Sequence, residues 1–204
     1  MDEFNLKEWL SVGVGDIIIF KDNSSLMEDM HGLGMTVDEV HTFRSDHINY
    51  IIFEFDARPD RLIIKYNNKD LFESRHYYPI EWMGEGSRED FLRNKFEFLF
   101  NPPETEQFLL KDLTWADQFS LICNEEDIVF RKVAGSEVYG EISDTKEPEV
   151  YFCGIVEFKA DKPVDDPLVL IMETGGEDSD IGGWVAPFEG HLIRPIELEV
   201  LKKH

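Results

Sequence analysis

The sequence contains little cysteine. Its two cysteines, Cys123 and Cys153, lie in the apolar runs "SLICN" and "YFCGI". In such surroundings cysteine behaves as a small hydrophobic core residue. Neither cysteine has a neighbour that would suggest a metal site, and the sequence does not favour a disulfide framework. We therefore expect reduced, buried thiols.

Long apolar runs are also missing. No segment approaches the roughly 18 consecutive apolar residues that a membrane-spanning helix needs. The first residues, "MDEFNLKEWL", lack the basic region and apolar stretch that are typical of a secretory signal. We therefore expect a cytoplasmic protein that does not associate with membranes.

The sequence is also poor in basic residues. The 204 residues include 20 Lys and Arg against 43 Asp and Glu, which gives a formal net charge of −23. Such a surface repels the phosphate backbone of nucleic acids and anionic lipid headgroups. It favours solubility, cations or a basic protein partner. We predict no nucleic-acid binding and a basic protein partner, with a plain acidic surface as the simpler alternative.

The sequence contains none of the common motifs that indicate a particular enzymatic reaction. The sequence has no Gly-x-Ser-x-Gly, no Gly-x-x-x-x-Gly-Lys, no His-Glu-x-x-His and no Cys-x-x-Cys. The six histidines show no zinc-type pairing along the chain. With 43 acidic residues, pairs of carboxylates are expected by number alone. The sequence favours a non-enzymatic protein. It leaves open an enzyme or ligand-binding β-barrel whose site is assembled in space from scattered histidines and carboxylates.

The chain does contain many segments whose residue pattern is typical of β-strands. It is 42% hydrophobic and includes 16 Phe, enough for a sizeable core. The stretches "DIIIF", "HINYIIFEFD" and "RLIIKY" in the first half, and six further runs in the second half, predict short strands between acidic or Gly/Pro turns. The fold class expected is β-rich α+β, with antiparallel sandwich- or barrel-like sheets and one or two short helices.

The expected organisation has two halves. Residues 1–101 predict a β-rich unit with a short N-terminal helix at "FNLKEWL" and a second helix near 87–100, and residues 102–204 predict a mostly antiparallel β unit. An internal similarity between "NYIIFEFDARPDRLIIKY" and "VYFCGIVEFKADKPVDDPLVLIM" favours two similar β units. A single domain spanning 1–204 stays open as the alternative.

The segment "METGGEDSDIGGW" contains the spacing of a calcium loop. Asp178, Asp180 and Glu189 stand where an EF-hand loop has oxygen ligands, and Gly183 stands at the position of the sharp turn. However, Gly182 offers no side-chain oxygen, and the flanking sequences are strand-like where an EF-hand needs helices. We expect a solvated acidic β turn. A weak calcium-binding β module is kept as an alternative, and no other cofactor is predicted.

Two tryptophans adjoin acidic glycine turns, "WMGEGSRED" and "GGEDSDIGGW". Arginine can stack on an aromatic ring while it pairs with carboxylates, so such a surface suits a basic partner. The residues predicted to bind this partner are Trp82, Glu85, Glu89, Asp90, Glu177, Asp178, Asp180 and Trp184. The function predicted is a protein-binding or regulatory module, of which an inhibitor or immunity-type protein is one form.

Overall fold

The computed structural model describes residues 6–21, 30–56, 58–67, 72–79, 107–109, 129–133, 138–145, 150–160, 168–174 and 184–203. The chain divides into two compact units. The first contains Met1–Tyr78, Gly140–Tyr151 and Leu192–His204, and the second contains Pro79–Tyr139 and Phe152–His191. The boundary expected between residues 101 and 102 lies outside the described residues and stays a prediction.

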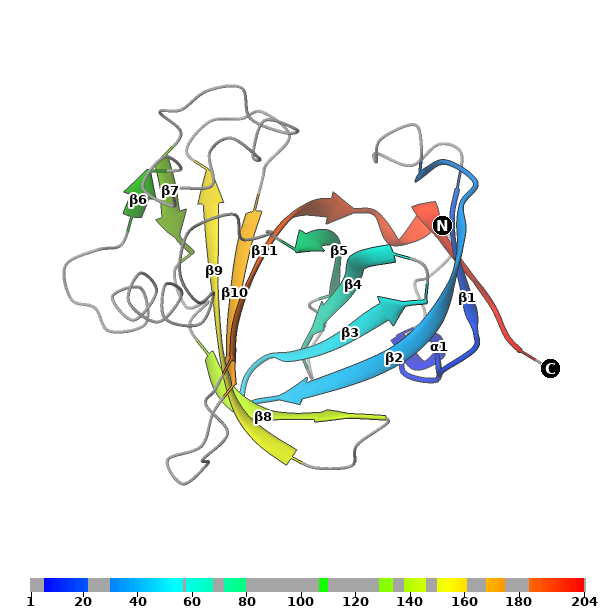
Figure 1. Ribbon diagram of the computed structural model, residues 1–204, viewed down its shortest axis with the longest axis horizontal. Coiled ribbons are helices and arrows are strands. Elements are labelled where there is room, and N and C mark those ends of the chain that lie inside the picture. Colours follow the sequence, from blue (N-terminus) through cyan, green and yellow to red (C-terminus); the bar gives the residue numbers. More distant parts are fainter. Residues whose placement is uncertain are drawn as a thin grey trace. The chain divides into compact units, whose positions relative to one another are not determined.

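The first unit is a curled antiparallel sheet with one short helix (Figure 1). Its strands follow the order β12-β1-β2-β3-β4-β5, and β8 pairs with β2 as well. The helix α1 comprises Leu6–Trp9. The strands are β1 (Ile17–Phe20), β2 (Gly34–Arg44), β3 (Asn49–Phe55), β4 (Arg58–Tyr66), β5 (Phe72–Pro79), β8 (Val138–Asp144) and β12 (Leu198–Leu201).

In the second unit the described strands follow the order β11-β10-β9-β7-β6. They are β6 (Gln107–Leu109), β7 (Val129–Lys132), β9 (Val150–Ala160), β10 (Leu168–Thr174) and β11 (Trp184–Ile193). The pairs that these described strands form with one another are all antiparallel. The expected β-rich antiparallel architecture is thus confirmed. Nothing in the described strands indicates that the two units are copies of each other.

Alternation along β1 and β3 explains why these segments form strands. Ile17, Ile18 and Ile19 are stiff at χ1 and suit the pleated backbone, and β1 buries Ile18 and Phe20 on one face. In β3, Phe53 and Phe55 are buried and Asp56, just beyond, is exposed, as the sequence predicts. The hairpin of β3 with β4 is also confirmed.

The core of the first unit lies on one face of this sheet, under α1. Trp9 packs against Phe53 with their ring centroids 6.0 Å apart. The buried members of this core are Trp9, Val12, Ile18, Phe20, Met30, Met35, Val37, Val40, Ile51, Phe53, Phe55, Leu62, Ile64, Ile193 and Leu198. Met30 and Met35 therefore fill the core, as methionine often does. Cys153, in the second unit, is a buried, reduced thiol, as expected.

One expected strand is interrupted. The sequence pattern of residues 196–200 predicts Ile196 inside and Glu197 outside. The structure shows the reverse, with Ile196 65% and Glu197 0% exposed. The cause is a 3-10 helix at Pro195–Glu197 that precedes β12. The Glu197 carboxylate accepts hydrogen bonds from the backbone N–H and the guanidinium of Arg194, at 2.7–3.1 Å.

No helix in the described part of the chain is long and apolar enough to cross a membrane.

Candidate functional sites

Most of the residues predicted to bind a partner are outside the described part of the chain. Two of the residues named from the sequence have a described backbone position, both in β11. Trp184 pairs with Thr174, and Glu189 pairs with Val169. The others, Trp82, Glu85, Glu89, Asp90, Glu177, Asp178 and Asp180, lie outside it, as does the helix expected near 87–100. These assignments stay predictions.

The flanks of the calcium-like segment are described. β10 ends at Thr174, β11 begins at Trp184, and the two strands are antiparallel neighbours. An EF-hand positions its ligands with a helix on each side of the loop. Here Glu189, the expected final ligand, stands inside a strand instead. The strand-like flanks inferred from the sequence are confirmed, and they do not support an EF-hand. Residues 175–183 between them lie outside the described residues, so the acidic turn stays a prediction.

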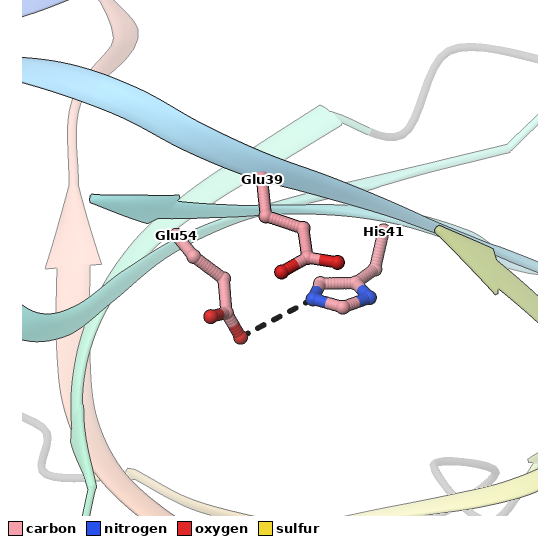
Figure 2. Close-up of side chains that lie close together, drawn as sticks. All are labelled: Glu39, His41 and Glu54. Atoms are coloured by element: carbon pink, nitrogen blue, oxygen red, sulfur yellow. Dashed lines mark ion pairs between the residues drawn. The ribbon is translucent and has the colours of Figure 1, made fainter. Parts of the chain in front are cut away.

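A different group of ligand-type side chains meets on the first unit. Glu39 and His41 belong to β2 and Glu54 to β3, and one ligand atom of each lies within 4.8 Å of the others. Figure 2 shows the His41 ring and the Glu54 carboxylate turned toward each other, with the Glu39 carboxylate beside the ring. His41 Nε2 is 3.2 Å from Glu54 Oε1. We call Glu39, His41 and Glu54 the carboxylate–histidine cluster.

The register of the sheet builds this cluster. Glu39 lies directly opposite Glu54, and Ile52 lies opposite His41. A β-bulge between Val37 and Glu39 shifts the register by one residue. Because of this extra residue, Val37 faces the core while Glu39 and His41 lie on the other face of the same strand. Bulges commonly redirect side chains in this way near binding sites.

Arg61 completes the electrostatic surroundings of the cluster. It lies opposite Glu54 on β4, and its Nε is 2.7 Å from Glu54 Oε1. Burial raises the pKa of Glu54, but the hydrogen bond from His41 and the charges of Arg61 and His41 outweigh burial, so the net pKa is lowered. Glu54 is therefore a carboxylate, an oxygen donor, at neutral pH.

The sequence alone does not predict this cluster, because its six histidines show no zinc-type pairing along the chain. The available signal is Glu39-x-His41 within "TVDEVHTF", because residues two apart share a face of a strand. That signal needs β2, which was not predicted, and the register that brings in Glu54.

A second group of polar residues is inaccessible. His76 Nε2 lies 3.3 Å from Asp60 Oδ2, and Arg58 Nε lies 2.9 Å from the same oxygen. Asp60 and His76 are 1% and 0% exposed, and Phe20 packs edge-on against His76 at 5.4 Å. No substrate reaches such a pair without unfolding of the core. Its role is to join β4 to β5 inside the sheet.

An exposed aromatic pair lies in the second unit. The rings of Tyr139 and Phe152 are stacked, with centroids 5.9 Å apart and planes at 12°. The two residues are 48% and 55% exposed. Stacked rings with half of their surface in water supply apolar contact area and an electron-rich face. This pair is a candidate contact surface for another molecule.

Comparison with protein-family models, with curated protein sequences and with solved structures gives no match for this chain.

Proposed function

We propose that this chain is a non-enzymatic acidic module that binds a basic protein partner. The observation that carries the proposal is the exposed stack of Tyr139 and Phe152 on a chain of net charge −23. The charge attracts and orients a basic partner over a distance, and the rings offer a place where a guanidinium can stack.

The chemistry of this surface favours arginine over lysine. Guanidinium is planar, weakly hydrated and able to stack on a ring while it pairs with carboxylates, whereas ammonium is a compact, strongly hydrated charge. A partner that itself binds nucleic acid presents such arginines. An inhibitor or immunity-type protein that neutralises a nucleic-acid-acting enzyme is the form of this function that best suits the charge.

The test uses two labelled peptides, one of arginine and one of lysine, titrated with the protein at low and high salt. Binding should weaken as salt rises, and the arginine peptide should bind more tightly. An exposed cation–π contact is worth about 0.5–1 kcal/mol, which corresponds to a roughly two- to five-fold preference.

The double variant Tyr139→Ser/Phe152→Ser should lose this preference and keep the salt dependence. Leu10→Ser/Leu201→Ser is the matched control, because these two residues are comparably exposed but belong to the other unit. Equal binding of both peptides to the unaltered protein would refute the proposal that the aromatic pair binds arginine side chains. Binding that is insensitive to salt would refute the acidic module itself.

A further inference from the structure

We infer that Glu39, His41 and Glu54 form a binding site for one divalent transition-metal ion of the zinc type. This inference is independent of partner binding, because the cluster and the aromatic pair belong to different units. The three side chains offer two carboxylate oxygens and one imidazole nitrogen within 4.8 Å of each other. No step of the proposed partner function uses them.

The register gives the first reason. Two carboxylates directly opposite each other on antiparallel strands repel, and such a pair destabilises a sheet. The structure places Glu39 opposite Glu54, on the strand face to which the bulge has redirected Glu39. A cation between these side chains converts the repulsion into attraction. His41 and Arg61 supply part of that compensation to Glu54.

The distances give the second reason. Zinc binds imidazole nitrogen and carboxylate oxygen at about 2.0–2.2 Å in a tetrahedron. Two ligand atoms of such a tetrahedron lie about 3.3–3.5 Å apart, from the same bond lengths. His41 Nε2 and Glu54 Oε1 are 3.2 Å apart, so one edge of the tetrahedron is nearly in place. The third ligand atom, from Glu39, lies within 4.8 Å of these two atoms.

The donor set selects the class of ion. Imidazole suits zinc, copper, iron and nickel, while magnesium and calcium prefer oxygen ligands alone. Three protein ligands leave a fourth tetrahedral position for water, which is the arrangement of open zinc sites. The side chains of His41 and Glu54 are 22% and 28% exposed, so an ion can enter from solvent.

Arg61 is the group that competes with the ion. Its Nε lies 2.7 Å from Glu54 Oε1, the same oxygen that faces His41. A positive guanidinium beside a divalent ion is repulsive, and the half-buried position weakens the screening by water. Replacing Arg61 by glutamine should therefore strengthen metal binding, whereas loss of a ligand should weaken it. A cluster that is only an ion-pair network would bind no ion in either variant.

The experiment is a calorimetric titration of the whole chain with Zn²⁺, in millimolar Mg²⁺ to saturate the generic carboxylates. One equivalent of Zn²⁺ should bind. Loss of a hydrogen bond that only orients a metal ligand already costs about 10- to 100-fold in metal affinity, so His41→Gln should weaken binding by at least about tenfold. Arg61→Gln should strengthen it several-fold. His47→Gln is the matched control, since His47 is an exposed histidine in the adjacent β2–β3 turn, and it should bind as the unaltered chain does.

A second variant guards against a loss that comes from misfolding. Glu39→Gln keeps the shape of the side chain and removes its charge, and it should weaken Zn²⁺ binding while the circular dichroism spectrum stays unchanged. X-ray absorption of the zinc-loaded chain should show only nitrogen and oxygen neighbours. Zn²⁺ binding that is equal in the unaltered chain, His41→Gln and His47→Gln, or a sulfur neighbour at the zinc, would overturn the site.

Discussion

Asp16 connects the N-terminal segment to the last residues of the chain through hydrogen bonds. We predict that replacing Asp16 lowers the free energy of unfolding. Its carboxylate accepts hydrogen bonds from the backbone N–H groups of Gly13, at 2.9 Å, and Lys203, at 2.8 Å. Lys202 Nζ lies 3.0 Å from Oδ2. One short side chain thus joins residues that are up to 187 positions apart in sequence.

The expected loss follows from these contacts. In Asp16→Ala two partly buried N–H groups lose their acceptor, and an unsatisfied buried donor costs about 1–3 kcal/mol. Water reaches both groups in part, so about 1 kcal/mol each is appropriate. The exposed ion pair with Lys202 adds at most about 0.5 kcal/mol. The free energy of unfolding should therefore fall by about 2–3 kcal/mol.

The pH dependence has a definite sign. Burial raises the pKa of Asp16, but the hydrogen bonds from Gly13, Lys203 and Lys202 outweigh it, and the pKa is lowered below its ordinary value of 3.8. A lowered pKa means that the carboxylate stabilises the fold fully above its unfolded-state pKa. That stabilisation is lost as the pH falls through the folded-state pKa. The difference between the unaltered chain and Asp16→Asn should be constant near neutral pH and should shrink in acid below about pH 3.8.

Urea unfolding followed by tryptophan fluorescence measures these changes. Asp46 lies in the exposed turn between β2 and β3, so Asp46→Asn and Asp46→Ala remove the same charge without removing a comparable tie. If Asp16→Ala is no less stable than Asp46→Ala at neutral pH, the contacts of Asp16 do not stabilise the fold. A stability difference between Asp16→Asn and Asp46→Asn that grows in acid would refute the sign of the pKa change.

Two further predictions concern the sheet. In Gly140→Ala the new Cβ would collide with the carbonyl oxygen of Arg44, so β8 has to move away from β2; overpacking of this kind typically costs about 1–3 kcal/mol. Urea unfolding should show this loss, and Gly13→Ala, whose Cβ meets nothing within 4 Å, should show little change. Ser74→Ala removes the buried hydrogen bond, 2.6 Å long, that the hydroxyl donates to the carbonyl of Ile193. It should lower the unfolding midpoint by an amount equivalent to about 1–2 kcal/mol, and an unchanged midpoint would show that this contact does not stabilise the fold.

The sequence predicted those strands whose alternation is simple. β1, β3 and β4 are short runs in which β-branched or aromatic residues dominate, and a run of that type has few alternatives to a strand. β2 escaped prediction although it has 11 residues. Its side chains do not alternate throughout, since Met35 and Val37 face the core at odd positions and Val40 does so at an even one. A pattern of period two cannot reveal a strand that changes its phase in the middle.

The same change of phase hid the carboxylate–histidine cluster. Without the bulge, Glu39 would share the face of Val37 and would point into an apolar core, which is an unfavourable place for a carboxylate. With it, Glu39 and His41 share a face with Glu54, which is brought in by pairing with β3 rather than by closeness in sequence. The bulge therefore has two effects. It keeps Val37 and Val40 in one core, and it places the ligand-type side chains on the opposite face of the strand. In a variant that lacks Asp38, Val37 and Glu39 would be adjacent and would stand opposite Phe55 and Glu54, so regular alternation would keep Val40 in the core and Glu39 and His41 on the other face. Zinc binding and the free energy of unfolding should therefore both be retained in this variant, and a loss of zinc binding in the folded variant would show that the register does not build the cluster.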